Sequence, residues 1–239
     1  MWVNIIYALI KEYPMSFRDQ THTCNDIVEG HTPWTLTHNQ PDLHNSWITK
    51  SWHSHWKGVV ERWCPNRSAV LQAGGWQGLF PQLLSDHFDH VITLEPEPTN
   101  FFCLANNCQS TKIVKLQAAL GAQTGWAKLD QTENSGQHRI HHEEFPLYDI
   151  GVKNQYIVPM LTVDSLNLPD LGLLFLDIEN YEIFALQGAV ETLKRTGATV
   201  IVERSFLNDV NIRVHNLLTG IGYKIEEDFG SDLVYVAAR

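Results

Sequence analysis

Short apolar runs alternate with longer amphipathic segments along the chain from about residue 68 onward. The amphipathic segments, near residues 79–87, 98–108, 180–195 and 209–220, are candidate helices. The apolar runs have the length and the β-branched and aliphatic content of strands: SAVLQA, HVITLE, KIVKLQAA, LGLLFLDI and ATVIVERS. This alternation predicts an α/β fold with a mainly parallel sheet.

Two segments depart from the alternation. The end of the chain, YKIEEDFGSDLVYVAAR, contains two strand patterns joined at DFGSD, which predicts a hairpin instead of another crossover. A polar segment, at about residues 124–159, is expected to add local strands or a loop over one end of the sheet.

Residues 1–67 have a different composition, with six of the twelve histidines and six of the eight tryptophans. We therefore expect an N-terminal helical or irregular extension there, followed by the main domain over residues 68–239. Within the extension, ITKSWHSHWKGVVERW predicts an amphipathic helix laid against the domain. Its apolar face would carry Trp52, Trp56, Val59, Val60 and Trp63.

Composition and charge limit the class of partner. At 239 residues with 44% hydrophobic content, the chain can form one well-buried core. Its 17 basic and 27 acidic residues give a formal charge of −10, which argues against a nucleic-acid partner whose phosphates must be neutralised.

The cysteines and the first residues bear on location. The four cysteines show no zinc-binding spacing and no disulfide framework, so we expect reduced thiols. The opening MWVNIIYALI has no preceding basic residue and is too short to span a bilayer, so we expect neither a signal peptide nor a membrane anchor. These features favour a cytoplasmic protein.

The stretch AVLQAGGWQGLF reads as a strand, a glycine turn and the start of a helix. Such a turn lets the backbone approach a ligand, and the helix adds unpaired N–H groups. Glu95 ends HVITLE twenty-one residues after Gly74, where a carboxylate can accept hydrogen bonds from both hydroxyls of a ribose. Together they predict a nucleotide-type cofactor, and the terminal hairpin favours the methyltransferase version of this fold over the dinucleotide-binding one.

From about Ser68 to Arg204, and loosely to the end, the chain resembles FkbM-type S-adenosylmethionine-dependent methyltransferases. The resemblance implies a Rossmann-like class I fold, with a mainly parallel seven-stranded sheet and a C-terminal antiparallel hairpin. It also implies S-adenosylmethionine as cofactor and a hydroxyl of a sugar, glycan or similar small polar acceptor as substrate. The motifs that carry it, in the family's order, are VLQAGGWQG, LEPEPTNFFCLANN, AALG, TVDSL, LDIENYEIFALQGA and VIVERS.

The resemblance assigns the cofactor-binding residues. Gly74, Gly78 and Glu95 would hold the cofactor, Gln72 would lie at its methionine end, and Ala118 or Ala119 would lie near the adenine.

Three positions depart from the family pattern. Gln72 replaces an acid. Its amide oxygen can still accept a hydrogen bond from the methionine amino group of the cofactor, but without the charge assistance that an acid would give. Phe175 stands where a lysine is common. Asn180 replaces a glycine, and asparagine is the residue that best keeps a left-handed turn in its place.

Methyl transfer to a hydroxyl needs alignment and a base. Asp177 is the first candidate, because it ends an apolar strand where open α/β sheets bind ligands and where an unpartnered charge is costly. Glu179 is the second candidate. Glu182 fits equally well as a complement to a helix N-terminus. Glu203 ends the next strand and with Asp177 forms a possible divalent-cation site, but two carboxylates are a sparse ligand set, so we expect no metal.

Other polar residues have alternative interpretations. His138, His141 and His142 lie in the polar segment, where a neutral imidazole can act as a base, although a solvated loop is the better expectation for each. Asp164 reads as a cap or loop residue. Trp76 either covers a ligand or packs within the turn.

Two alternatives to an active methyltransferase stay open. The departures at Gln72, Phe175 and Asn180 are also compatible with a non-catalytic binding or structural protein of the same fold. A nicotinamide-dependent oxidoreductase shares the turn and the acid, but it does not explain the terminal hairpin.

Overall fold

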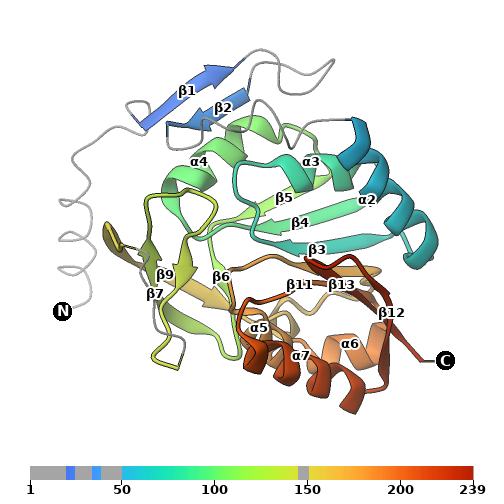
Figure 1. Cartoon of the computed structure of the whole chain (residues 1–239). Coiled ribbons are helices and arrows are strands. Elements are labelled where there is room, and N and C mark those ends of the chain that lie inside the picture. The colour runs from blue at the N-terminus through green and yellow to red at the C-terminus, as the bar shows by residue number, and fades with distance from the viewer. Residues whose placement is uncertain (1–19, 25–33, 39–49, 145–150, 239) are drawn as a thin grey trace.

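The computed structural model describes residues 20–24, 34–38, 50–144 and 151–238. At its centre lies a seven-stranded sheet in the order β12-β13-β11-β10-β3-β4-β5 (Figure 1). The last five strands in this order are parallel to one another, and they coincide with the five apolar runs predicted as strands. They are β3 (Ala69–Ala73), β4 (His90–Leu94), β5 (Ile113–Leu116), β10 (Leu173–Leu176) and β11 (Thr199–Glu203).

Helices cover both faces of the sheet, which explains why its central strands are apolar on both sides. Every residue of β3 and β10 is buried. On one face lie α2 (Lys50–Trp63), α3 (Leu79–Ser85) and α4 (Pro98–Asn107), and on the other α5 (Glu182–Gln187), α6 (Val190–Thr196) and α7 (Asn208–Gly220) (Figure 1). The predicted α/β architecture is confirmed.

Helix α2 forms the predicted amphipathic packing. Trp56, Val59 and Val60 are buried and share one apolar cluster with Phe175 of β10 and Leu83 of α3. The ring centroids of Trp56 and Phe175 lie 5.2 Å apart, edge to face. The helix is therefore part of the core under the sheet, although it lies before the boundary predicted at residue 67.

The single helix predicted over 180–195 is wrong: two helices, α5 and α6, form there. The chain bends at Gly188, where an added Cβ would lie 2.2 Å from the carbonyl oxygen of Gly121. Asp164 then caps α6, with its Oδ1 accepting from the Thr192 N–H at 2.7 Å. The apolar spacing does not reveal this break, because the buried face continues from Ile183 to Leu193 across it.

The predicted terminal hairpin is present as β12 (Tyr223–Asp228) and β13 (Asp232–Ala237). Its second strand enters the sheet between β11 and β12 and is antiparallel to both. The antiparallel strand is therefore internal, and β12 forms the edge.

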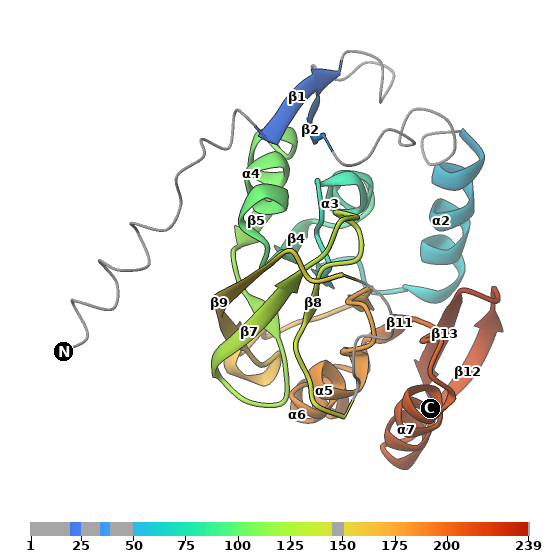
Figure 2. The same cartoon turned by 60° about the vertical axis from the view of Figure 1, so that its left-hand side comes forward.

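The polar segment builds a second, four-stranded sheet in the order β6-β9-β7-β8 (Figure 2). The prediction of local strands is confirmed, with residues 145–150 outside the described part. The strands are β6 (Ala119–Leu120), β7 (Gly125–Gln131), β8 (Arg139–Ile140) and β9 (Asn154–Leu161).

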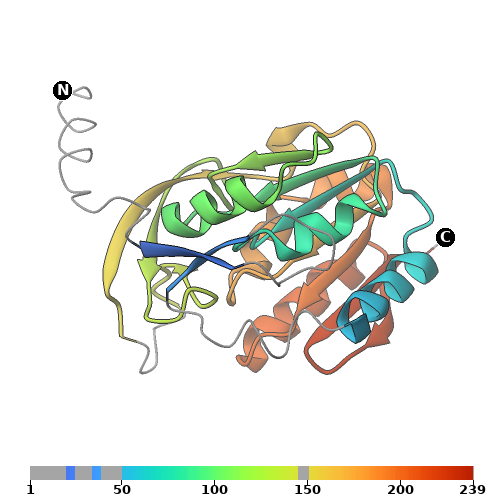
Figure 3. The same ribbon diagram turned by 90° about the horizontal axis from the view of Figure 1, so that it is seen from above.

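Strands β1 (Thr21–Cys24) and β2 (Trp34–Thr37) form an antiparallel pair beside α4 (Figure 3). Asn107 at the end of α4 accepts from the Thr35 N–H at 2.7 Å and donates to the Thr35 carbonyl at 2.9 Å. The same side chain donates to the carbonyl of Gln77 at 2.7 Å, so the pair is tied to the glycine turn.

Within the described ranges, no helix has the length and apolar character that a bilayer crossing requires. The opening MWVNIIYALI lies outside the described residues. Cys64, Cys103 and Cys108 are buried free thiols, as predicted for them.

Candidate functional site

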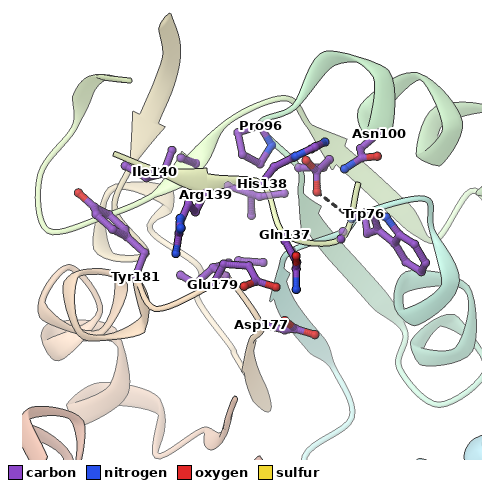
Figure 4. A pocket seen from close by; sticks show the side chains of 18 of the residues that line it. Trp76, Pro96, Asn100, Gln137, His138, Arg139, Ile140, Asp177, Glu179 and Tyr181 are labelled. Atoms are coloured by element: carbon purple, nitrogen blue, oxygen red, sulfur yellow. Dashed lines mark hydrogen bonds between the residues drawn. The ribbon is translucent and has the colours of Figure 1, made fainter. Parts of the chain in front are cut away.

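A cavity of about 330 Å³ opens at the carboxyl ends of β3, β4, β10 and β11. Open α/β sheets bind ligands at this edge, and the volume suits a small molecule. Residues 134–140, which comprise the loop before β8 and β8 itself, cover it, and Figure 4 shows Gln137 and Arg139 pointing toward Asp177 and Glu179. Six of the predicted site residues line the cavity: Gly74, Glu95, Ala118, Ala119, Asp177 and Glu179.

Close packing accounts for the glycines of the turn. Gly74 has a φ of +85°, and a Cβ added to it would lie 1.8 Å from the carbonyl oxygen of Asp177. Gly78 has a φ of +100°, and its Cβ would meet Sγ of Cys108 at 2.7 Å. Both therefore need glycine where strand β10 or helix α4 approaches. Gly78 lies outside the cavity wall, so its position does not support the cofactor contact predicted for it.

Gln72 is fully buried and points into the protein. Its Nε2 donates to the carbonyl oxygen of Gly74 at 2.7 Å, and its Oε1 accepts from the Thr93 hydroxyl. Gln72 does not line the cavity, so the predicted hydrogen bond from its amide oxygen to a cofactor finds no support. The side chain instead holds the glycine turn.

Glu95 is placed as the sequence predicted, at the end of β4 and in the cavity wall. Its Oε2 accepts from the Trp76 N–H at 2.8 Å, and its Oε1 accepts from the Glu97 N–H at 2.9 Å. A carboxylate has about four acceptor positions, so capacity remains for two hydroxyl donors. Burial raises the pKa of Glu95 to about 8.

Trp76 packs within the turn and lies in the cavity wall, and its covering of a ligand stays a prediction. It lines the cavity, and its indole N–H donates to the hydroxyl of Ser135 at 3.1 Å. Gln77 donates to the same hydroxyl at 3.1 Å, and Asn100 donates to the Ser135 carbonyl at 2.8 Å. Thr37 of β2 also bonds this hydroxyl, at 3.1 Å. The cover over the cavity is therefore fixed to the turn by hydrogen bonds.

Three carboxyl groups meet on the β10 and β11 side of the cavity. Asp177, Glu179 and Glu203 each offer an oxygen within 4.8 Å of the others. Burial raises the pKa of all three, that of Glu179 to about 8. The pKa of Glu203 is raised further by the neighbouring Asp177, and their hydrogen bond favours ionised Asp177. Asp177 is therefore the member most suited to accept a proton.

The same three oxygens suit a divalent cation, which prefers hard oxygen ligands. The sequence identified Asp177 and Glu203 as a sparse pair, and the fold adds Glu179. That the reaction needs no metal ion stays a prediction.

The turn after β10 has the left-handed backbone that the sequence predicted for Asn180. Glu179 and Asn180 have φ angles of 56° and 76°. The Asn180 Oδ1 accepts from the Ser205 hydroxyl, which joins the ends of β10 and β11. Glu182 accepts from the Ile178 N–H at 3.0 Å, so its role at the helix start is structural.

The three histidines have separate positions. His138 lines the cavity, burial lowers its pKa to about 4, and its Nδ1 accepts from the Thr132 N–H at 3.1 Å. With Nδ1 accepting, the neutral ring carries its proton on Nε2 and cannot act as a base there. The Nδ1 of His141 contacts Asp130 at 2.8 Å, and the ring of His142 lies tilted against that of Phe184, with 4.3 Å between centroids. Neither of these two lines the cavity.

Arg139 and Tyr181 also line the cavity, and the sequence singled out neither. Arg139 comes from β8, a strand of two residues, which is too short to show an alternation of buried and exposed positions. Tyr181 follows the predicted acids directly, at the start of α5. Their proximity to Glu179 depends on the second sheet folding over the first.

Comparison with known proteins identifies the domain. A family model described as the methyltransferase FkbM domain matches residues 75–225, more than half of the 239 residues. No curated protein sequence matches the chain.

A solved structure shows the same fold. The FkbM methyltransferase of Methylobacillus flagellatus KT superposes with a TM-score of 0.52 and 16% identity, over 71% of this chain and 43% of that one. This chain thus spans less than half of that protein, and the likeness confirms the class I methyltransferase fold. The precorrin 8w decarboxylase of Methanobacterium thermoautotrophicum is similar over 80% of this chain and 91% of its own, with 12% identity and a TM-score of 0.48.

The family match and the fold agree with the order of motifs along the chain, from the glycine turn to the strand that ends at Glu203. The chain belongs to the FkbM methyltransferase domain family.

Proposed function

We propose that this protein transfers a methyl group from S-adenosylmethionine to a hydroxyl of a sugar or glycan-like acceptor. The observation that carries the proposal is that Glu95 and Asp177 line one cavity within a domain of the FkbM family. In this proposal the carboxyl group of Glu95 binds the ribose, and that of Asp177 accepts a proton.

The residues of the cavity fit this cofactor. Glu95 keeps free acceptor positions for the ribose hydroxyls, and Ala118 and Ala119 leave room for a flat ring beside it. The cofactor supplies a methyl group already activated on a sulfonium.

The chain's own contribution is alignment and proton removal. Asp177 would accept the proton of the acceptor hydroxyl as the oxygen of that hydroxyl bonds the methyl carbon. The bond from this carbon to the sulfonium sulfur would break in the same step, which would leave S-adenosylhomocysteine as the second product. Glu203, protonated because burial and Asp177 raise its pKa, helps to keep Asp177 ionised through their hydrogen bond. Residues 134–140 restrict the access of water, which would otherwise compete for the methyl group.

The proposal is tested by incubating the protein with S-adenosylmethionine labelled in its methyl group and a panel of sugars and oligosaccharides. We expect label in a base-stable methyl ether, and its loss in Asp177→Asn with binding of S-adenosylhomocysteine retained. Glu61→Gln, an exposed acid on α2, is the matched control. Label on nitrogen or carbon, or full activity of Asp177→Asn, would contradict the proposal.

A further inference from the structure

Arg139 is a buried cation at the wall of the cavity. The side chain is 7% exposed, lines the cavity and extends from β8 toward Glu179 (Figure 4). Its Nε and Nη2 atoms are buried without a hydrogen-bond partner among the described residues. A guanidinium keeps its charge in proteins. The Nε and Nη2 donors of this charged group therefore lack both water and a protein acceptor, which costs free energy.

The nearest acids do not accept hydrogen bonds from Nε or Nη2 of Arg139. Asp130 lies opposite Arg139 in the register of β7 and β8, but its oxygens already contact Gln155 at 2.6 Å and His141 at 2.8 Å. Glu179 faces the guanidinium (Figure 4), but it does not accept a hydrogen bond from Nε or Nη2. The two acids therefore leave both of these donors without an acceptor.

The unpartnered atoms suit a carboxylate. Nε and Nη2 are the adjacent donors of the guanidinium, and such a pair binds both oxygens of one carboxylate. A modest rotation of the flexible side chain would present them to the cavity that Arg139 already lines. A carboxylate there would remove the cost of leaving these two buried donors unsatisfied.

The location assigns this carboxylate to the acceptor. The strand order places β3 between β4, which ends at Glu95, and β10, after which Glu179 follows. A ribose bound at Glu95 would thus lie two strands away from Glu179, the acid that Arg139 faces. The groups around Arg139 are Glu179 and Tyr181, beside the proposed base Asp177.

We infer that Arg139 binds a carboxylate carried by the methyl acceptor, so that the acceptor is an acidic sugar of the uronic acid class. This inference rests on the proposed function. It adds a binding site for an anionic group to a cavity in which four of the six other titratable residues are carboxylic acids.

The first test compares acidic and neutral sugars on the wild-type protein saturated with S-adenosylhomocysteine. Saturation-transfer NMR measures the affinity of glucuronate against glucose, and of galacturonate against galactose. We expect at least one acidic sugar to bind about tenfold more tightly than its neutral counterpart, as one charge-assisted contact allows. Equal affinities in both pairs would overturn the inference.

The second test uses Arg139→Gln and Arg139→Lys. We expect the preference for the acidic sugar to disappear in the first and to persist in part in the second, with circular dichroism reporting folding. Arg195→Gln, whose side chain bonds the carbonyls of Leu168 and Pro169 before β10, is the control. An unchanged preference in a folded Arg139→Gln would overturn the inference.

A third titration separates acceptor from donor. S-adenosylhomocysteine has an amino-acid carboxylate, and 5′-methylthioadenosine lacks it. We expect Arg139→Gln to bind both as the wild type does. If only S-adenosylhomocysteine binds more weakly, Arg139 holds the donor's carboxylate and the inference is wrong. If the wild type binds neither ligand, the proposed function fails first, and the inference fails with it.

Discussion

The side-chain amide of Gln72 donates a hydrogen bond to the carbonyl oxygen of Gly74 at 2.7 Å. A carboxylate, the group more usual at this position in the family that the chain resembles, cannot donate this bond. The amide also accepts from the Thr93 hydroxyl, so both of its ends are satisfied in a fully buried place. Gln72 therefore stabilises the local structure of the turn.

Gln72→Glu should destabilise the protein, because two acceptors would then face each other without a proton between them. We expect a loss of about 2 kcal/mol, the cost of a buried unsatisfied polar group. In a domain of this size that lowers the melting temperature by roughly 4–8 °C. Calorimetry measures it, with the exposed Gln123→Glu as control. A Gln72→Glu protein as stable as the wild type would show that the bond to Gly74 contributes nothing.

Removal of the Trp56 side chain should lower the stability of the whole domain, because its ring packs against Phe175 of the central sheet. Trp56→Ala should cost about 3–5 kcal/mol in the free energy of unfolding, as for other buried large side chains. Trp126, which is 70% exposed, provides the same substitution at the surface, and Trp126→Ala should cost little. Equal effects of the two in urea titrations would mean that α2 is not part of the core.

The rate of methyl transfer should fall on the acidic side of its pH profile. This fall should occur at a pH above about 4, the ordinary pKa of an aspartate. The base must be ionised, and burial together with Asp232 raises the pKa of Asp177. The rate should therefore fall as the pH drops through this raised value. Asp177→Asn should remove this fall and lower the rate on the order of 10²- to 10⁴-fold. A fall that persists in the variant would assign the base elsewhere.

Binding of the cofactor product should release a proton from Glu95. Burial raises the pKa of this carboxyl to about 8, so it is mostly protonated at neutral pH, and two ribose hydroxyl donors favour its ionised form. Affinity for S-adenosylhomocysteine should thus increase as the pH rises toward 8 and weaken as it falls. Titration in two buffers of different ionisation enthalpy detects the proton, and Glu95→Gln should abolish its release. Identical apparent enthalpies for the wild type would contradict the assignment.

Hydrophobic periodicity predicted the strands, the layers of helices and the terminal hairpin, because each of these buries a regular apolar face. It missed the break between α5 and α6, since Gly188 bends the chain without interrupting that face. The insertion of β13 between β11 and β12 depends on pairing between distant strands, which no local pattern records.

For the site, residues that end parallel strands were predictable, because the edge of such a sheet is known from the strands themselves. Glu95 and Asp177 are examples. The orientation of Gln72 was not predictable, since a strand residue faces either side according to the register. The contributions of Arg139 and Ser135 depend on how the second sheet folds over the cavity, which involves contacts far apart in sequence.

Calorimetric titration with S-adenosylmethionine and S-adenosylhomocysteine, with NAD as the competing ligand, tests the central claim most directly. We predict micromolar binding of both adenosyl ligands, at least tenfold weaker binding by Glu95→Ala, and no binding of NAD. Binding of NAD alone would indicate an oxidoreductase. Binding of none of the three would contradict the account and indicate a non-catalytic protein with a methyltransferase fold.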